Sequence, residues 1–408
     1  MNFNQLALSL IEERLKSHPS TEELLGQIIT AARSGSIAFY PCSRCTNDVV
    51  KMLQKSSPQT VASIAGIFDS SPDAFAEAGI AVYPPSEFPL FQPSLAAVVV
   101  TANIFYARET ERIRRLLGPE TPIINISGID LELAGADRAE LMVQIREVAG
   151  LLADEKSRIV YLLAWLARLL NDENLTQLFA DDRESEVCSM NGTTFYKNYR
   201  LDNLPAEIVG ELEADVYSLK TISAASGDTV LDVGAFKGDT AIYFADLVGA
   251  SGKVISFEPV KSNYQDLVHN IRQNGLEHIV LPVNKGCGSA SGSIRIATAP
   301  QGSPWAFFSP ERGVEDIYVT TVDEFVAGEG LERVDFIKLD VEGVEREVIM
   351  GAKKTIVGFS PKMAVSLYHN LLDLTDLPLL LNSMADYKLY VRCKMAGPWS
   401  IFLYCEPK

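Results

Sequence analysis

The segment Thr229–Thr240, with the sequence TVLDVGAFKGDT, most limits what this chain can fold into. An apolar run of strand length ends near Asp232, and a turn that contains Gly234 and Gly238 follows it. Glycine at such a turn lets the backbone approach a ligand closely, and the helix that begins near Thr240 offers free amide groups at its N-terminus. The segment therefore predicts the strand, turn and helix of an α/β fold, with a ligand at the turn.

A second acidic residue follows the next predicted strand, which ends at Phe257-Glu258-Pro259. An acid at this place accepts hydrogen bonds from ribose hydroxyls. A dinucleotide site usually has Gly-x-Gly-x-x-Gly, because the second glycine makes room for the pyrophosphate. Here the spacing is Gly-x-x-x-Gly behind Asp232, which disfavours a pyrophosphate and suits a cationic ligand with an amino-acid end. Together these residues indicate a nucleoside-binding crevice.

Strand-length apolar runs alternate with helical patterns over residues 205–408, which predicts an α/β domain with a mainly parallel sheet. The end differs, because residues 387–394 and 399–405 alternate between apolar and polar positions around Ala396-Gly397-Pro398, as a hairpin does. The sheet should therefore include an antiparallel strand at or near its edge. The predicted strands are 229–233, 253–257, 278–283, 334–339 and 362–367, and the predicted helices are 240–247, 263–274, 343–350 and 374–382.

A smaller Rossmann-like α/β domain is predicted at residues 1–135, followed by a helical connector at residues 136–204. Residues 1–34 should form two helices, the second with Ser20 and Glu23 in capping-box spacing. Residues 138–181 should be nearly all helix, and the polar stretch 181–186 is the predicted linker. The strands of this domain are predicted at 37–40, 62–68, 80–83, 96–101 and 123–126, and its helices at 44–54, 72–78 and 108–117.

Composition excludes several classes of protein. Lys and Arg number 36 against 53 Asp and Glu, so the formal charge is −17, and such a surface repels the phosphate backbone of nucleic acids. No apolar stretch approaches the roughly 20 residues that span a bilayer, and no secretory signal opens the sequence. Cys42 and Cys45 have the spacing of a redox or zinc half-site, but no second pair completes it, so ordinary packing is favoured. We expect a reduced, cytoplasmic protein.

Residues 229–408 resemble the FkbM family of class I methyltransferases, which have a Rossmann-like fold and use S-adenosylmethionine. The terminal hairpin fits this resemblance, since class I methyltransferases insert antiparallel strand seven between strands five and six. Phe236 departs from the family, which often has Asn there. The matching motifs are Asp232-Val-Gly-Ala-x-x-Gly-x-Thr240, Phe257-Glu258-Pro259, Asn270 with Asn274, Thr321-Val-Asp323, and Ile337-Lys-Leu-Asp-Val-Glu-Gly-Val-Glu345.

The resemblance implies a role for each matched position. Asp232 would support the turn and the amino group of the cofactor, Glu258 would hold the ribose, and Pro259 would be a further cofactor-binding residue. Asp340, at the end of strand four, would face the sulfonium and the acceptor. The family mostly methylates hydroxyl oxygens, often on sugars, glycolipids or polyketides. Asn284 and Lys285 would lie near adenine, and the methionine part would contact Gly234, Ala235, Phe236, Lys237, Gly238 and Thr240.

Methylation of a weakly acidic sugar hydroxyl favours a general base. His369, at the carboxyl end of a predicted strand, is one candidate. The pair Asp340 and Glu342 is the other, because residues two apart on a strand point the same way and can share a proton or hold a divalent metal. Two oxygen ligands are too few to assign a metal site. Part of the family also has a Tyr-His pair after strand five, which is Tyr368-His369 in this chain. In this resemblance Asp373 would orient the histidine.

The N-terminal domain loosely resembles the small Rossmann-like domain of polysaccharide-biosynthesis proteins, through residues 64–73 and 78–84. This resemblance makes Asp69 the ribose acid, although the glycine-rich turn is missing. Ser43 and Arg44, at a helix start, are candidates for binding a phosphate. The alternative is a degenerate domain that serves docking or homo-oligomer formation.

The sequence thus predicts an S-adenosylmethionine-dependent O-methyltransferase that acts on a hydroxyl of a sugar-containing or polyketide-like acceptor, either a small molecule or a glycan. Two alternatives remain open. One is an NAD-dependent enzyme that modifies nucleotide sugars, against which the glycine spacing and the terminal hairpin count. The other is a non-catalytic interaction module, which would bind the cofactor without turnover.

Overall fold

The computed structural model describes residues 3–41, 44–69, 80–91, 94–102, 107–172, 175, 189–190, 193–204, 206–298, 306–308, 315–395 and 400–408. The predicted helix 72–78, the predicted linker 181–186 and residues Cys42 and Ser43 lie outside them. The chain forms two compact units, Met1–Gln144 with Trp165–Leu175, and Ile145–Ala164 with Thr176–Lys408. The predicted domain limits at residues 135 and 204 stay a proposal.

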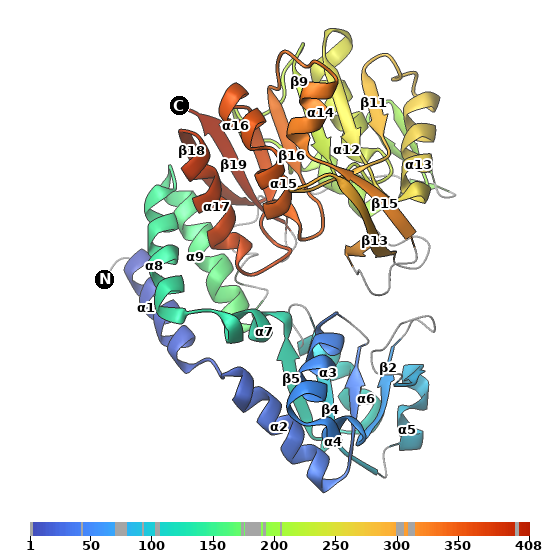
Figure 1. The fold of residues 1–408 in the computed structure, drawn as a ribbon, viewed down its shortest axis with the longest axis vertical. Helices are drawn as coiled ribbons and strands as arrows, with labels where there is room; N and C mark the ends of the chain where they lie inside the picture. The colour runs from blue at the N-terminus through green and yellow to red at the C-terminus, as the bar shows by residue number, and fades with distance from the viewer. Residues whose placement is uncertain are drawn as a thin grey trace. The chain divides into compact units, whose positions relative to one another are not determined.

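The first unit contains a parallel sheet with the strand order β3-β2-β1-β4-β5 (Figure 1). Buried apolar side chains lie on both faces of it, as the unbroken apolar runs of its strands predict. The Ser20–Glu23 capping box is present, with the Ser20 amide donating to Glu23 Oε2 at 2.7 Å. The strands are β1 (Ser36–Tyr40), β2 (Ile64–Phe68), β3 (Val82–Tyr83), β4 (Leu95–Ala102) and β5 (Ile123–Ser127).

The helices up to residue 170 follow the predicted pattern apart from their ends, except that the short helices at 58–61, 88–91 and 128–135 were not predicted. Cys45 is buried at the start of the third of them, and its thiol lies 3.6 Å from the Ile126 carbonyl oxygen, which agrees with a packing role. These helices are α1 (Phe3–Ser17), α2 (Thr21–Ser34), α3 (Arg44–Ser56), α4 (Pro58–Val61), α5 (Phe88–Phe91), α6 (Ala107–Leu117), α7 (Gly128–Gly135), α8 (Arg138–Leu151) and α9 (Glu155–Leu170).

The second unit is built on a seven-stranded sheet with the order β11-β10-β9-β16-β17-β19-β18. Five neighbouring strands are parallel, and β19 runs antiparallel between β17 and β18, so the predicted place of the antiparallel strand is confirmed. The strands are β9 (Thr229–Val233), β10 (Lys253–Phe257), β11 (Val280–Val283), β16 (Phe336–Leu339), β17 (Lys362–Ser366), β18 (Tyr387–Cys393) and β19 (Ile401–Pro407).

Two groups of helices accompany this sheet. In one, α12 contacts both α11 and α13; in the other, α14 contacts α15 and α16, and α17 contacts the same two helices. The strand order reverses between β9 and β16, and right-handed crossovers on either side of a reversal bring helices to opposite faces. The helices are α11 (Ala206–Glu213), α12 (Asp239–Val248), α13 (Lys261–Gln273), α14 (Val322–Gly328), α15 (Glu345–Gly351), α16 (Lys353–Phe359) and α17 (Asp373–Met384).

The segment between α8 and α9 is fastened to the terminal hairpin of the same unit. The Ala153 amide donates to the Leu389 carbonyl at 2.8 Å, and the buried Arg392 guanidinium pairs with Asp154 at 2.6 Å. Burial raises the pKa of Asp154, but its hydrogen bonds with Arg392 and Ser157 outweigh that effect and lower the pKa to about 2. The ion pair therefore anchors the helical segment to β18.

The second unit also holds two small sheets that the sequence did not predict. Their strands include exposed positions, so they lack the apolar runs that mark the main sheet. One consists of β12 (Gly286–Cys287), β13 (Gly292–Thr298), β14 (Ala306–Phe308) and β15 (Glu315–Thr320), and the other of β6 (Ser189–Met190), β7 (Thr193–Tyr196) and β8 (Tyr199–Asp202).

Among the described residues, every helix is too short or too polar to cross a membrane.

Candidate active site

The glycine turn after β9 lies against the end of β16, at the point where the strand order reverses. Val233 pairs with Leu339 in the sheet, so the next residues of the two strands, Gly234 and Asp340, lie side by side. Gly234 has a φ of 92°, and a Cβ added there would lie 1.9 Å from the carbonyl oxygen of Asp340. Only glycine fits this position, which brings the predicted cofactor turn and the predicted acceptor side together.

Asp232 is fully buried and supports the turn from beneath. Its carboxylate accepts hydrogen bonds from Thr240 Oγ1 at 2.9 Å and from Ser256 Oγ at 3.0 Å, and Lys338 Nζ lies 3.6 Å away. Lys338 Nζ also donates to the Gly234 carbonyl oxygen at 2.5 Å. These contacts place the Asp232 carboxylate beneath the turn, and its predicted role toward the turn and the amino group of the cofactor stays a prediction.

The turn itself has a tightly bonded backbone. The amides of Gly234 and Ala235 both donate to the Phe257 carbonyl, and Phe236 has a φ of 45°. The Lys237 side chain does not project into the crevice, because its Nζ donates to the Asn203 carbonyl at 3.0 Å and lies 3.3 Å from Asp266. Any contribution of Lys237 to a ligand would come from its backbone.

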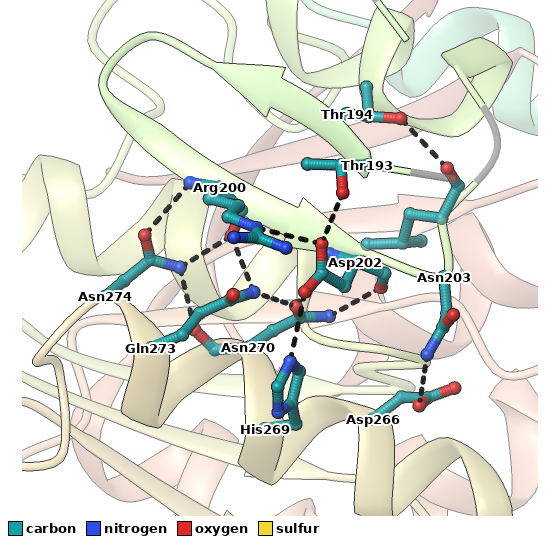
Figure 2. Close-up of polar contacts among 11 residues, drawn as sticks. Thr193, Thr194, Arg200, Asp202, Asn203, Asp266, His269, Asn270, Gln273 and Asn274 are labelled. Carbon is teal, nitrogen blue, oxygen red and sulfur yellow. Dashed lines mark hydrogen bonds and ion pairs between the residues drawn. The ribbon is translucent and has the colours of Figure 1, made fainter. Parts of the chain in front are cut away.

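A polar network joins the β7–β8 hairpin to α13 (Figure 2), and one of its residues, Asn270, also bonds to this turn. The Asn270 side chain is buried, accepts from the Asp202 amide at 2.9 Å, and donates to the carbonyls of Asp202 at 3.1 Å and Lys237 at 2.8 Å. Asn274 makes a similar pair of bonds with the backbone of Arg200. The two Asn of the family resemblance therefore fasten the hairpin, and Asn270 alone of the two reaches the turn.

Glu258 is buried beyond the end of β10. Burial raises its pKa to about 8, although the Val260 amide, which donates to its Oε1 at 2.9 Å, and Asn263 act in the opposite direction. Asn284 Nδ2 donates to the carbonyls of Glu258 and Pro259, so the loop after β11 is held against the predicted ribose acid. Lys285 is exposed.

The predicted catalytic residues meet around the ring of His369. Asp340 Oδ1 and Glu342 Oε2 each lie 3.5 Å from His369 Nε2. The sequence analysis expected Asp340 and Glu342 to point the same way because they would alternate along a strand. In the structure β16 ends at Leu339 and Glu342 has a φ of 58°, so both acids lie in the loop after the strand. Asp340 also accepts hydrogen bonds from the hydroxyls of Tyr217 at 2.9 Å and Tyr368 at 3.0 Å.

Glu345, which was not expected in the site, binds the other nitrogen of the ring. Its Oε1 lies 2.8 Å from His369 Nδ1, and the side chain of Glu345 is fully buried. The structure gives Glu345 the orienting role that was predicted for Asp373. Asp373 instead accepts hydrogen bonds from the backbone and side-chain nitrogens of Asn370 at the start of α17. Glu345 lies in the quoted motif, but nothing in the motif shows that it faces the histidine.

The charges of this cluster oppose one another. Burial by itself would lower the pKa of His369, but the carboxylates of Glu345, Asp340 and Glu342 outweigh burial and raise it to about 10. Burial raises the pKa of Glu342 to about 7. Two more acids near the turn also escaped sequence analysis in any role: burial, together with neighbouring acids, raises the pKa of Glu211 to about 8 and of Asp239 to about 7. The site is rich in buried acidic groups, and a cation bound beside them would favour their charged forms.

Comparison with known proteins agrees with this geometry. Residues 232–387 match the family model of the methyltransferase FkbM domain. This part of the chain is therefore similar to an FkbM methyltransferase domain. It contains the turn, Glu258 and the cluster around His369, and the methyltransferase prediction is thereby supported.

A curated relative and a solved structure are similar over different lengths. Over 139 residues the chain is 28% identical to the hexuronic acid methyltransferase AglP of Haloferax volcanii. The aligned residues are 34% of this chain and 56% of that relative. The crystal structure of methyltransferase FkbM from Methylobacillus flagellatus KT superposes with a TM-score of 0.58 at 16% identity, covering 99% of both chains. This second likeness shows the fold alone.

Proposed function

We propose that this FkbM-like domain transfers a methyl group from S-adenosylmethionine to a hydroxyl of a sugar-containing acceptor. The family match supports methyl transfer, and the relative's name supports an acceptor that contains a sugar. A polyketide-like acceptor stays the second choice. The observation that carries the proposal is the contact of Gly234 with Asp340, because it places a nucleoside-type turn directly beside a cluster of acids and a histidine.

The residues at the turn fit S-adenosylmethionine. Glu258 is a buried carboxyl group beside the turn, suited to the two ribose hydroxyls. Asp239 Oδ1 is buried beside the same turn and lacks a hydrogen-bond partner among the described residues, which suits a cationic amino group. When bound, the cofactor supplies an electrophilic methyl group. The proposed contacts are Asp232, Gly234, Ala235, Phe236, Lys237, Gly238, Thr240, Glu258, Pro259, Asn284, Lys285 and Asp340.

The acceptor would bind at the face formed by Asp340, His369 and Glu342. Alignment of the two reactants there is worth about 7–11 kcal/mol in effective molarity. The oxygens of Asp340 already accept from two tyrosines, and Glu345 Oε1 accepts from the Val341 amide and faces the histidine. Glu342 keeps 29% of its side chain exposed, so it is the carboxylate best placed to take the hydroxyl proton.

The proposal is tested by incubating the protein with methyl-labelled S-adenosylmethionine and a panel of hexoses, hexuronic acids and their glycolipids. We expect label in a sugar, in a product that resists mild alkali, since an ether survives conditions that hydrolyse a methyl ester. Wild-type activity in both Asp340→Ala and His369→Ala would overturn the catalytic assignment. Micromolar binding of S-adenosylhomocysteine, about −8 kcal/mol, without turnover on any acceptor would favour the non-catalytic alternative. Binding of NAD in its place would favour the nucleotide-sugar alternative.

A further inference from the structure

Lys338 is a buried lysine in the middle strand of the main sheet, beside the cofactor turn. It is 1% exposed, and it lies opposite Asp232 in the register of β9 and β16. Its Nζ lies 3.6 Å from Asp232 Oδ1, so the two residues form an ion pair within the sheet. A buried ion pair adds little to stability over apolar residues of similar volume, because both charges must be removed from water. Stability alone therefore does not explain a lysine at this position.

The ammonium group of Lys338 lies closer to the turn than to Asp232. Its Nζ donates a hydrogen bond to the Gly234 carbonyl at 2.5 Å, and a charged donor makes such a bond strong. The Gly234 amide donates to the Phe257 carbonyl at 3.1 Å. Both backbone groups of Gly234 are therefore held, the amide by β10 and the carbonyl by Lys338.

The same ammonium group also contacts the tyrosine that holds Asp340. Lys338 Nζ lies 5.2 Å from the centre of the Tyr217 ring, a distance at which a cation is attracted to the face of an aromatic ring. The Tyr217 hydroxyl donates to Asp340 Oδ2 at 2.9 Å. One cation thus contacts both the cofactor turn and the support of the acceptor side.

The positive charge of Lys338 acts on the acids around the turn as well. Burial lowers the pKa of Lys338, but Asp232, Asp340 and Asp239 outweigh burial and raise it, so the ammonium group stays charged. Burial raises the pKa of five acids of the site, and the charge of Lys338 opposes that rise in each of them. These acids are Glu211, Asp232, Asp239, Glu258 and Glu342.

We propose that Lys338 is a positioning residue for the cofactor: its ammonium group holds the Gly234 carbonyl and the Tyr217 ring, so that the methionine part of the cofactor meets a preformed turn beside Asp340. This inference rests on the proposed function, because the ligand of the turn is taken to be S-adenosylmethionine. The alternative is that Lys338 only neutralises Asp232. The two roles differ in what Lys338 contributes once Asp232 has lost its charge.

The test is a double-variant cycle on the full chain, with calorimetric titration of S-adenosylhomocysteine. Lys338→Met alone leaves the Asp232 carboxylate buried without its counter-charge, which should destabilise the fold. The decisive comparison is therefore Asp232→Asn with and without Lys338→Met. In this background Lys338→Met should still raise the Kd at least tenfold, because the Gly234 carbonyl loses its donor, while the melting temperature should exceed that of Lys338→Met alone.

Lys362→Met is the matched control. Lys362 begins the neighbouring strand β17, and its Nζ also donates to a backbone carbonyl, that of Ser223 at 3.2 Å. It lies at the opposite end of the sheet from the turn, so its replacement should leave the Kd within about twofold of the wild type. Circular dichroism and melting temperatures establish that each variant is folded.

The inference fails if Asp232→Asn binds S-adenosylhomocysteine with the same Kd, within about twofold, whether or not Lys338→Met is also present. Lys338 would then be the counter-charge of Asp232 and nothing more, and the proposed function would stand. A tenfold rise in Kd for Lys362→Met would also overturn it, because loss of any lysine from the sheet would then weaken binding. No binding by the wild type would remove the proposed function and this inference together.

Discussion

The side-chain amide of Asn270 donates a hydrogen bond to the carbonyl oxygen of Lys237 at 2.8 Å, and so ties α13 to the cofactor turn. The same side chain pairs with both backbone groups of Asp202, in the way that a neighbouring strand would. Asn270 therefore joins the β7–β8 hairpin (Figure 2) to the turn through one buried group. We infer that it positions the turn for its ligand.

Replacing Asn270 tests this positioning role. Asn270→Asp puts a carboxylate oxygen against the carbonyls of Lys237 and Asp202, and should lower the free energy of unfolding by about 1–3 kcal/mol and raise the Kd for S-adenosylhomocysteine about tenfold. Calorimetric titration and chemical denaturation measure the two effects. Asn274→Ala is the control, because Asn274 fastens the hairpin without a bond to Lys237. Equal effects on Kd in both variants would show that only the hairpin matters.

The local parts of this fold could be predicted because their signals are strong and adjacent in the sequence. The strand β9 is buried from Val230 onward, and the glycines that follow have positive φ, at 92° for Gly234 and 98° for Gly238. The antiparallel position of β19 could be predicted because apolar and polar residues alternate over 387–394 and 399–405, on both sides of a predicted turn. The family resemblance then supplied roles for positions that no local pattern explains.

The contacts that assemble the catalytic cluster could not be predicted in the same way. Tyr217 and Asp340 are 123 positions apart in the sequence. Nothing in the sequence around Tyr217, which precedes β9, indicates that its hydroxyl binds Asp340. Glu345 begins α15, and an acidic residue is common at the start of a helix because it interacts favourably with the helix dipole. The sequence therefore contains no sign that Glu345 contacts His369. The small strands β13 and β15 were missed because their burial is irregular and their outer side chains are exposed.

Gly234 should tolerate no side chain. In Gly234→Ala the new Cβ would overlap the Asp340 carbonyl oxygen, at 1.9 Å, and would also strain a backbone with positive φ. We expect a loss of more than about 3 kcal/mol of stability, seen as insoluble protein or a strongly lowered melting temperature. Gly275→Ala is the matched control: it has a φ of 67° but no atom within 4 Å of the added Cβ, so it should lose only about 1 kcal/mol. Similar melting temperatures for the two variants would contradict the crowding argument.

Glu258 should make both stability and cofactor binding depend on pH. Burial raises its pKa to about 8 in the folded protein, above its ordinary value of 4.5. The folded state thus holds the proton more tightly than the unfolded state, and the group's contribution to stability falls as the pH rises from about 4.5 to 8 and then levels off, with a slope of up to about 1.4 kcal/mol per pH unit. Denaturation across this range should show the slope in the wild type and a flatter curve in Glu258→Gln.

The same group links binding to proton release. If ribose hydroxyls donate to the Glu258 carboxylate, the proton must leave on binding, so the Kd for S-adenosylhomocysteine should fall by up to about tenfold per unit between pH 6.5 and 8. Titration calorimetry in buffers of different ionisation enthalpy should detect close to one proton released below pH 8. A Kd that does not change with pH, together with no proton release, would exclude Glu258 as the ribose ligand.

Glu342 should affect the rate of methyl transfer and leave cofactor binding alone. It is the partly exposed carboxylate of the cluster, 3.5 Å from His369 Nε2, while the oxygens of Asp340 are occupied by tyrosine hydroxyls. Glu342→Gln keeps the size of the side chain but cannot accept the hydroxyl proton, so we expect kcat to fall about 10²–10⁴-fold. The KM for the acceptor and the Kd for S-adenosylhomocysteine should stay within about twofold, because neither depends on that proton.

Glu347→Gln, which changes an exposed acid two residues beyond Glu345 on α15, should behave as the wild type. If Glu342→Gln keeps kcat within about fivefold while Asp340→Asn and His369→Gln lose it, the proton leaves by another route and Glu342 serves only to balance the charge of His369.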